Sequence, residues 1–566
     1  MIKKGHLVMI RQDVFNNPTN EQRHQLLQDA LTRAGRPEDY ENVLELLSPP
    51  SDIYDFARPG TLKNTRIGII GGGLAGLSAA YELRKLGANI TIFDAEADRI
   101  GGRVYTYYFD KSKKYFGEFG ALRIPVSHET TWHYINLFQL NTQSLASPAS
   151  NNFIYAHQTR IRRDLSGDSI TEALYPKYDL TETEAKTPWP ELRDYAFSTM
   201  LNSLSPKMRT EILKILPEYS NQYAGITKLS NRQVFEMLEL SQGAISLISA
   251  VEPLTGALLN RSHDQLMSSL YSLDFANVYK IDGGMVLLPM AFYKSLMKEN
   301  PPEYQLSSNL VGRVTIKLGH IVNGLSKSLH TDKITLRYSN LKGKAFTDTF
   351  DYVVCTIPYS TLREMKITPL FSDQKMQAIK ELWYLDAQKT LFLCRQRFWE
   401  EDTDYGRING GISFTDLPIQ SILYPSDHIR CEEPKTCSFK DPGVLTASYN
   451  LGQDPARVSN QSPQRRFELI KQNVEAVHGL PAKYLDTLVN SHKTVHWSTQ
   501  QWARGGFALS GPGQKVNFSY AMLQPEYNNR VFFAGEHVST KQGWMQGSLY
   551  TGKAAANGIA LQASTP

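Results

Sequence analysis

"RIGIIGGGLAGLSAAYEL", residues 66–83, runs from a β-branched apolar segment through three consecutive glycines into an apolar helical pattern. The isoleucines at positions 67, 69 and 70 predict a short buried strand of a parallel sheet. The small and apolar residues behind the glycines predict a helix that starts immediately after the turn. Such a strand–turn–helix unit presents backbone N–H groups and the positive end of a helix dipole to an anion.

The glycines of this turn have the spacing of a dinucleotide-binding motif. Gly71, Gly73 and Gly76 fit G-x-G-x-x-G: the first allows a tight turn, the second lets the backbone approach a pyrophosphate, and the third lets helix and strand pack closely. A second apolar strand, "NITIFDA" (residues 89–95), carries Asp94 near its end, where a carboxylate can hold the hydroxyl pair of a ribose. A packing turn without a ligand is the alternative, and the combined features favour a bound dinucleotide.

Length and composition limit the possible classes of protein. The 566 residues are enough for two or three domains. The hydrophobic content is 41% and the charged content 21%, and the net charge of +5 is slight for this length, which argues against a nucleic-acid partner. We expect no membrane span, because no stretch reaches the roughly 18 apolar residues that a span needs. The N-terminal stretch has no long apolar core and no cleavage site, so we expect no signal peptide and a cytoplasmic location.

The four cysteines do not form a disulfide framework for a chain of this size. Cys355 and Cys394 lie in apolar, strand-like segments and are expected to be buried thiols. Cys431 and Cys437 flank a short polar loop; a local bridge between them is one alternative, and two free loop thiols are the favoured one. The pair His492 and His496 lies in a strand-like segment without a third ligand, so we expect no metal site.

The order of patterns along the chain indicates an interrupted domain. Residues 20–50 predict two helices that pack on the body of the protein, and residues 180–275 are dominated by helical signals, including a capping box at Ser230 and Gln233. From residue 304 onward, β-rich segments follow, and the last 40 residues return to a buried strand, "RVFFAG", and an alanine-rich helix. A nucleotide domain with its first strand near residue 67 and its last near residue 531 must therefore contain inserted domains.

Three later motifs are candidates for chemistry. In "RIGGRVYT" (99–106), Arg103 follows two glycines and can neutralise a phosphate or contact a ring edge. In "FGEFGALRIP" (116–125), Arg123 lies in an apolar, aromatic setting, where a buried arginine needs an acidic partner from the protein or from a ligand. Near the C-terminus, "FFAGEHVSTKQGW" (532–544) has Glu536 at the end of a strand and Trp544 just before a helix.

This ordered set of motifs resembles the flavin amine oxidase family, and within it most closely the L-amino acid oxidases, over nearly the whole chain from about residue 20. The resemblance implies an α/β fold: an interrupted Rossmann-like FAD-binding domain, a mixed β-sheet substrate domain and a helical insertion. We expect the FAD-binding domain at 61–104, 277–357 and 525–566, and the substrate-binding domain at 105–164 and 358–524. The helical domain is expected at 165–276, and residues 1–60 are expected as a helical preface that packs on the substrate domain.

The resemblance also implies non-covalent FAD, since none of the four cysteines lies in the loop at the flavin ring. Asp94 stands where the family usually has glutamate, Leu122 where methionine is more usual, and Val314 at an adenine contact for which Val311 is the alternative. The cofactor-binding positions carried over from the family are Gly71, Gly73, Leu74, Ala75, Gly76, Asp94, Ala95, Gly102, Arg103, Gly120, Ala121, Leu122, Arg123, Val314, Gly535, Glu536, Gly543, Trp544, Met545, Gln546, Gly547 and Ser548.

For the substrate, the family pattern implies that Arg123 and Tyr424 clamp an amino acid carboxylate, as a planar guanidinium and a phenol can. Gly543 and Trp544 match the opposite wall of the site. Lys389 matches the family lysine that holds a water near the flavin. The aromatic pair Trp497 and Trp502 resembles the pair that precedes the family's second Gly-Gly, with a purely structural role as the alternative.

The implied activity is oxidation of an L-amino acid by FAD and O2, giving 2-oxo acid, ammonia and hydrogen peroxide. A flavin-dependent amino acid monooxygenase is the nearest alternative, followed by a carboxylate-free amine oxidase. A nicotinamide dehydrogenase and a flavin-holding binding protein are more distant alternatives.

We expect a homodimer or higher homo-oligomer. The side-chain preference is not readable, because the helical segment builds that pocket and its acids (Glu236, Glu239, Asp264 and Asp274) are all compatible with surface positions.

Overall fold

A five-stranded parallel sheet joins the two ends of the chain. The computed structural model describes residues 16–145, 151–328, 330–428 and 437–565. In this sheet Ile67 and Phe532 both lie beside the same strand, which confirms that the early glycine turn and the late strand belong to one interrupted unit. The strand order is β10 (Val314–Leu318), β2 (Asn89–Asp94), β1 (Arg66–Ile70), β14 (Tyr352–Cys355) and β23 (Val531–Phe533).

The two faces of this sheet are covered differently. Ile67 and Ile69 share a hydrophobic core with α3 (Leu74–Arg84), α14 (Leu287–Met297) and α20 (Met545–Ser564). Ile70 belongs to a second core under a four-stranded sheet, as expected for alternating side chains of a strand buried on both faces. That sheet has the order β13 (Ala345–Phe350), β12 (Ile334–Asn340), β11 (His320–Lys327) and β15 (Lys366–Thr368).

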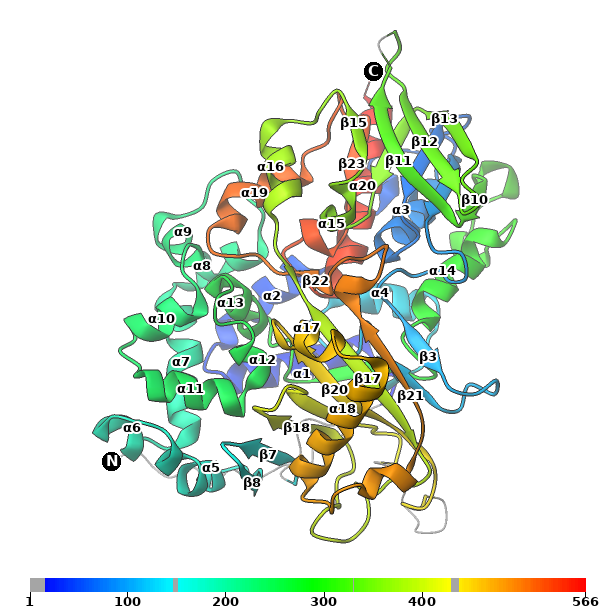
Figure 1. The fold of residues 1–566 in the computed structure, drawn as a ribbon. Helices are drawn as coiled ribbons and strands as arrows, with labels where there is room; N and C mark the ends of the chain where they lie inside the picture. The colour runs from blue at the N-terminus through cyan, green and yellow to red at the C-terminus, as the bar shows by residue number, and fades with distance from the viewer. Residues whose placement is uncertain (1–15, 146–150, 329, 429–436, 566) are drawn as a thin grey trace.

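A seven-stranded mixed sheet forms the second large layer, in the lower part of Figure 1. One face packs against α18 (Pro463–His478), whose Ile470 and Val474 share a core with Phe392 of the sheet. The strand order is β21 (Val489–His496), β17 (Ala387–Cys394), β20 (Gly443–Leu451), β19 (Ser421–Tyr424), β18 (Gly411–Thr415), β7 (Phe153–Ala156) and β8 (Thr159–Arg162).

Between β8 and β9 (Val278–Ile281) the chain forms helices and loops, which lie to one side of both sheets (Figure 1). The capping box predicted at Ser230 and Gln233 is present at the start of its helix. The longer helices of this segment are α5 (Asp168–Ala173), α7 (Trp189–Ser203), α9 (Asn221–Thr227), α10 (Asn231–Met237), α11 (Gln242–Val251) and α13 (His263–Tyr271).

The two predicted N-terminal helices are α1 (Asn20–Arg33) and α2 (Tyr40–Leu47). Arg23 of α1 donates to the carbonyl of Val126 at 2.9 Å and pairs with Glu129 of α4 (Glu129–Leu137). Arg209 of the helical segment pairs with Asp39, just before α2, at 2.8 Å. These buried ion pairs fix the helical preface against the rest of the chain.

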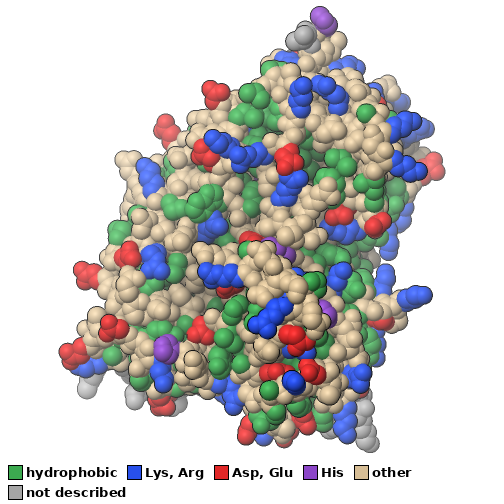
Figure 2. All heavy atoms as spheres, viewed as in Figure 1, with side chains coloured by type: hydrophobic (Ala, Val, Ile, Leu, Met, Phe, Trp, Pro, Cys, Tyr) green, Lys and Arg blue, Asp and Glu red, His purple; other side chains and the backbone are tan. Residues whose placement is uncertain are grey.

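The surface and the cysteines complete the description. Basic and acidic side chains are interspersed over the face seen in Figure 2. Within the described ranges, no helix is long and apolar enough to cross a bilayer. Cys355 and Cys394 are buried free thiols, as predicted. Cys437 is disulfide-bonded, so the expectation of free loop thiols is wrong for it, and Cys431 lies outside the described residues.

Candidate active site

One cavity of about 1050 Å³ lies where the parallel sheet, the seven-stranded sheet and the helical segment meet. Most of the predicted cofactor positions line it, although they come from distant parts of the chain. The lining positions are Gly71, Gly73, Leu74, Ala75, Asp94, Ala95, Gly102, Arg103, Gly120, Ala121, Leu122, Arg123, Gly535, Glu536, Gly543, Trp544, Met545 and Ser548.

The glycine turn has the geometry that a pyrophosphate site needs. Gly71 has φ +108°, a conformation that residues with a Cβ rarely adopt. A Cβ on Gly76 would lie 2.0 Å from the Gly71 carbonyl oxygen, so this glycine serves the close contact of helix and strand and does not line the cavity. No side chain caps α3, which leaves the first N–H groups of the helix free for an anion at the cavity wall.

Asp94 lies at the carboxyl end of β2 and organises this turn. Its carboxylate accepts hydrogen bonds from the N–H groups of Gly72 and Glu96, both at 2.8 Å. Burial raises the pKa of Asp94 to about 6, against the lowering effect of the two bonds. Glu96 also lines the cavity and pairs with Arg99 at 3.0 Å. Neither Glu96 nor Arg99 was singled out from the sequence, although both lie in the loop that follows the acidic strand end.

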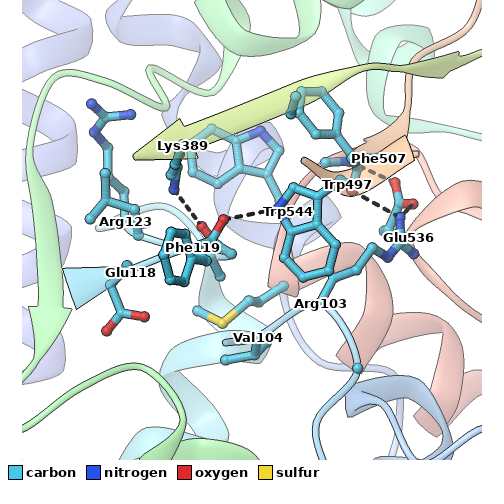
Figure 3. A pocket seen from close by; sticks show the side chains of 18 of the residues that line it. Arg103, Val104, Glu118, Phe119, Arg123, Lys389, Trp497, Phe507, Glu536 and Trp544 are labelled. Atoms are coloured by element: carbon cyan, nitrogen blue, oxygen red, sulfur yellow. Dashed lines mark hydrogen bonds and ion pairs between the residues drawn. The ribbon is translucent and has the colours of Figure 1, made fainter. Parts of the chain in front are cut away.

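Glu536 joins three segments of the cavity wall. It pairs with Arg103 at 2.7 Å and accepts from the N–H groups of Gly543, at 2.8 Å, and Ala508, at 3.1 Å (Figure 3). The guanidinium of Arg103 is thus directed to a protein carboxylate rather than left free for a phosphate. Burial and these donors keep the three segments in fixed register.

The segment that contains Arg123 runs along the cavity next to the lysine strand. The carbonyl of Gly120 accepts a hydrogen bond from Lys389 Nζ at 2.8 Å, and that of Phe119 accepts one from Trp497 Nε1 at 2.9 Å (Figure 3). Within the described part of the chain, the Arg123 guanidinium has no hydrogen bond or ion pair; its Cζ lies 5.8 Å from the centre of the Phe275 ring. A guanidinium that lines a cavity without a protein partner is suited to an anionic ligand.

Lys389 is 4% exposed, and burial lowers its pKa to about 7. Glu118, which lines the cavity, opposes that shift, while burial raises the pKa of Glu118 itself to about 7. Lys389 can therefore hold or release a proton close to neutral pH.

The structure does not bring the hydroxyl of Tyr424 to this site. Although Tyr424 touches the cavity, its hydroxyl lies 2.8 Å from both Ser413 Oγ and His478 Nε2, on the face of the sheet that packs against α18. Tyr449 is the phenol beside Arg123. It pairs with Lys389 across β17 and β20, and the Lys389 ammonium lies 4.8 Å from the centre of its ring. Sequence reasoning missed Tyr449, because a β-bulge between Thr390 and Leu391 changes which side chains face the cavity.

Three further predicted positions also lie away from the cavity surface. Val314 pairs with Ile90 inside the parallel sheet and packs on its core; the cavity is instead lined by Val322, on the next strand. Gln546 donates to the carbonyl of Leu47 at 2.7 Å and so fixes the preface. Gly547 permits a close contact with Ser539, whose Oγ would lie 2.1 Å from a Cβ there.

Trp544 forms the wall opposite Arg123. Its ring lies 5.6 Å from Phe275 and 4.9 Å, edge to face, from His128. Trp497 and Trp502 also line the cavity. The helical segment contributes Leu254, Leu258 and Phe275, so it does build one side of the cavity, as the sequence indicated.

A profile described as flavin-containing amine oxidoreductase matches residues 74–560. The chain belongs to this family. The L-amino-acid oxidase of Crotalus adamanteus is 25% identical over 540 residues, which cover 94% of this chain and 92% of that protein. The L-amino-acid oxidase of Daboia russelii is 26% identical over 534 residues, covering 93% of each.

Two solved structures share the fold. Putrescine oxidase bound to putrescine has a TM-score of 0.66 at 17% identity, covering 88% of this chain and 98% of that one. Cyclohexylamine oxidase from Brevibacterium oxydans IH-35A has a TM-score of 0.64 at 17% identity, covering 88% and 99%.

FAD is the cofactor of this family, and the cavity fits it. The uncapped helix and the glycine turn suit the pyrophosphate, Asp94 suits a ribose, and the segment of Gly120 to Arg123 lines the same cavity as Trp544. Neither of the free thiols, Cys355 and Cys394, lines the cavity.

Proposed function

We propose that this chain is an FAD-dependent L-amino acid oxidase that binds FAD non-covalently. The observation that carries the proposal is the unpaired Arg123 guanidinium in the cavity, beside Lys389 and Tyr449. A bidentate guanidinium suits the carboxylate of an amino acid, and a phenol supplies one more donor. The names of the relatives from Crotalus adamanteus and Daboia russelii agree with this activity.

The residues have distinct tasks in the proposed reaction. Arg123 and Tyr449 bind the carboxylate and thereby fix the direction of the Cα–H bond. The Gly543 carbonyl accepts a hydrogen bond from the substrate amine, and Trp544 packs against the substrate. Bound FAD supplies the hydride acceptor. Lys389, with a pKa of about 7, holds a water and can take up a proton at Nζ. The amine must be neutral for hydride loss, so the rate rises with pH.

The products of the proposed reaction are a 2-oxo acid, ammonia and hydrogen peroxide, the last from O2. An anaerobic screen of the twenty L-amino acids for loss of flavin colour tests the substrate class. Aerobic assays for peroxide and ammonia, against amide and carbon dioxide, separate the oxidase from the amino acid monooxygenase. Bleaching by amines but by no amino acid would overturn the proposal, since Arg123 would then have no anionic partner.

We propose the domain division expected from the sequence, which the two large sheets support; β15, in the four-stranded sheet, and β9, which pairs with Ile124–Pro125 and Thr142–Ser144, cross its boundaries. The strands of the parallel sheet lie within 61–104, 277–357 and 525–566, those of the seven-stranded sheet within 105–164 and 358–524, and α5 to α13 within 165–276. A homo-oligomer and a cytoplasmic location belong to the same proposal. Light scattering on the purified protein tests the first. Cell fractionation tests the cytoplasmic location. The disulfide at Cys437 makes this test a demanding one, because disulfides are rare in a reducing cytoplasm.

A further inference from the structure

A buried ionic network lies directly behind the Trp544 wall. Lys541 Nζ lies 2.6 Å from the Asp274 carboxylate, whose other oxygen lies 3.1 Å from His128 Nε2. The hydroxyl of Ser272 completes the network, donating to Asp274 at 2.8 Å and accepting from Lys541 at 2.8 Å. All three charged or ionisable side chains are at most 2% exposed. They come from three distant segments: before α4, after α13 and before α20.

Each member of the network is coupled to an aromatic ring of the substrate cavity. The His128 ring packs edge to face on Trp544 at 4.9 Å. Asp274 immediately precedes Phe275, whose ring lies 5.6 Å from Trp544 and 5.8 Å from the Arg123 guanidinium. The backbone carbonyl of Lys541 accepts a hydrogen bond from the backbone N–H of Trp544 at 3.3 Å, which holds the loop that carries the ring. Phe275 is 56% exposed even though it belongs to the cavity wall, so its ring faces open space that a ligand can fill.

The energetics argue against a purely stabilising role. Burial lowers the pKa of Lys541 while Asp274 opposes that shift, and the pKa of Asp274 is lowered to about 2, because Lys541 and His128 outweigh its burial. Two further carboxylates also favour the charged forms: Asp264 raises the pKa of Lys541, and Glu129 raises the pKa of His128, both against the effect of burial. Burying such charges costs desolvation energy that apolar side chains of similar size avoid, so a contribution to stability does not by itself account for the network.

We propose that Lys541, Asp274 and His128 are positioning residues that hold Phe275 and Trp544 at the distance from Arg123 that the substrate needs. This inference rests on the proposed substrate site. The network joins the end of the helical segment to the loop before α20, so it sets the width of the space between the two aromatic rings and the guanidinium. Its loss widens or tilts that space; His128 and Asp274 do not line the cavity themselves, whereas Lys541 does.

The chain offers a matched control. Lys515 and Asp264 form a second buried pair, with Lys515 Nζ 3.4 Å from the carboxylate and 2.6 Å from the carbonyl of Ile212. Like the first pair, it links α13 to the C-terminal part of the chain, here through α19 (Gln514–Leu523). Neither Lys515 nor Asp264 lines the cavity.

The test compares Lys541→Met/Asp274→Asn with Lys515→Met/Asp264→Asn. Both double variants remove a charge pair together, so neither leaves a lone buried charge. Flavin content, melting temperature, KM, kcat and the affinity for benzoate, read from the flavin absorption spectrum, are measured for each holoenzyme. We expect the first variant to lose roughly ten- to a hundredfold in kcat/KM and a similar factor in benzoate affinity, as misplaced binding groups do. The second variant keeps both constants near the wild-type values.

Equal losses in the two variants, or no loss in the first, would overturn the inference. His128→Phe is measured as well, because His128, unlike Lys541, does not line the cavity. In this variant the ring edge against Trp544 remains, the bond to Asp274 is lost, and weakened benzoate binding is again expected; it also replaces Lys541→Met/Asp274→Asn if that variant does not fold. Unchanged benzoate affinity in His128→Phe overturns the inference too. If the wild-type enzyme oxidises only carboxylate-free amines, the proposed function fails, while the comparison of KM values between the double variants still tests the network.

Discussion

Lys389 and Tyr449 lie opposite each other on neighbouring antiparallel strands, with the Lys389 ammonium 4.8 Å from the centre of the Tyr449 ring. Both face the cavity that holds Arg123. The hydroxyl of Tyr424, by contrast, is directed to Ser413 and His478 on the other face of the same sheet. Our proposal of Tyr449 as the carboxylate-binding phenol therefore rests on the register of the sheet.

Tyr449→Phe removes one donor to the substrate carboxylate. A hydrogen bond to a charged group contributes about 1.5–3 kcal/mol, so kcat/KM should fall roughly ten- to 150-fold. Steady-state kinetics with the best L-amino acid measures this. Tyr424→Phe is the matched control: Ser413 and His478 lose a buried partner, so the melting temperature falls while KM stays. A larger KM effect in the Tyr424 variant would reverse the assignment.

Arg123→Ala removes the charge partner of the substrate carboxylate. It also removes the bidentate guanidinium contact that orients this carboxylate. By analogy with broken buried ion pairs the cost is about 3–5 kcal/mol, or roughly 150- to 5,000-fold in kcat/KM. Arg123→Lys should recover only part of this, because an ammonium is a point charge. The decisive measurement is the preference for an amino acid over the matching carboxylate-free amine, which Arg123→Ala should lose. A variant that keeps this preference with full flavin content contradicts the clamp.

Asp94→Ala should weaken retention of FAD. The substitution removes the ribose acceptor and also the partner of the Gly72 and Glu96 N–H groups, and each bond to the charged group contributes about 1.5–3 kcal/mol. Flavin content after dialysis is the readout. Asp98→Ala serves as the control, since Asp98 is an exposed carboxylate in the same loop. Equal flavin retention in both variants would remove Asp94 from the cofactor site.

Lys389→Met should separate the two halves of the reaction. We expect the oxygen-dependent half to slow, because the variant lacks the amine that holds a water and exchanges a proton near pH 7. Anaerobic bleaching by substrate should change much less. Stopped-flow absorbance measures the two halves separately, and equal losses would indicate a structural role.

The same variant should change how stability depends on pH. The folded-state pKa of Lys389 is about 7, below its ordinary value, so between about pH 7 and 10 the unfolded chain binds more protons at this residue than the folded one. Burying Lys389 therefore costs most at and below pH 7, and this cost disappears as the pH rises toward 10. The melting temperature of Lys389→Met should exceed that of the wild type most at pH 7, with the difference shrinking toward pH 10. A constant difference would exclude the lowered pKa.

Local sequence patterns were sufficient to predict the part of the cofactor site that the backbone forms. The glycine turn, Asp94 and the uncapped start of α3 are contiguous or nearly so in sequence, and each follows from strand, turn and helix rules. Arg123 was also identified from the sequence, because a lone guanidinium in an apolar segment needs a partner.

The sequence by itself thus determined the interrupted dinucleotide fold, the cofactor turn and the cation Arg123 in an apolar segment, while the structure showed that this cation has no protein carboxylate as its partner. Only the tertiary structure decided which phenol joins Arg123, which valine reaches the cavity, and that Asp264 and Asp274 are buried rather than on the surface. The physical reason is that neighbouring residues of a strand point to opposite faces. The bulge between β17 and β20 brings Tyr449 to the cavity, while Tyr424, on β19, directs its hydroxyl to the other face, and Val314 and Val322 lie on strands of two different sheets. The burial of Asp274 depends on Lys541 and His128, which lie far from it in the chain and meet it only in the fold.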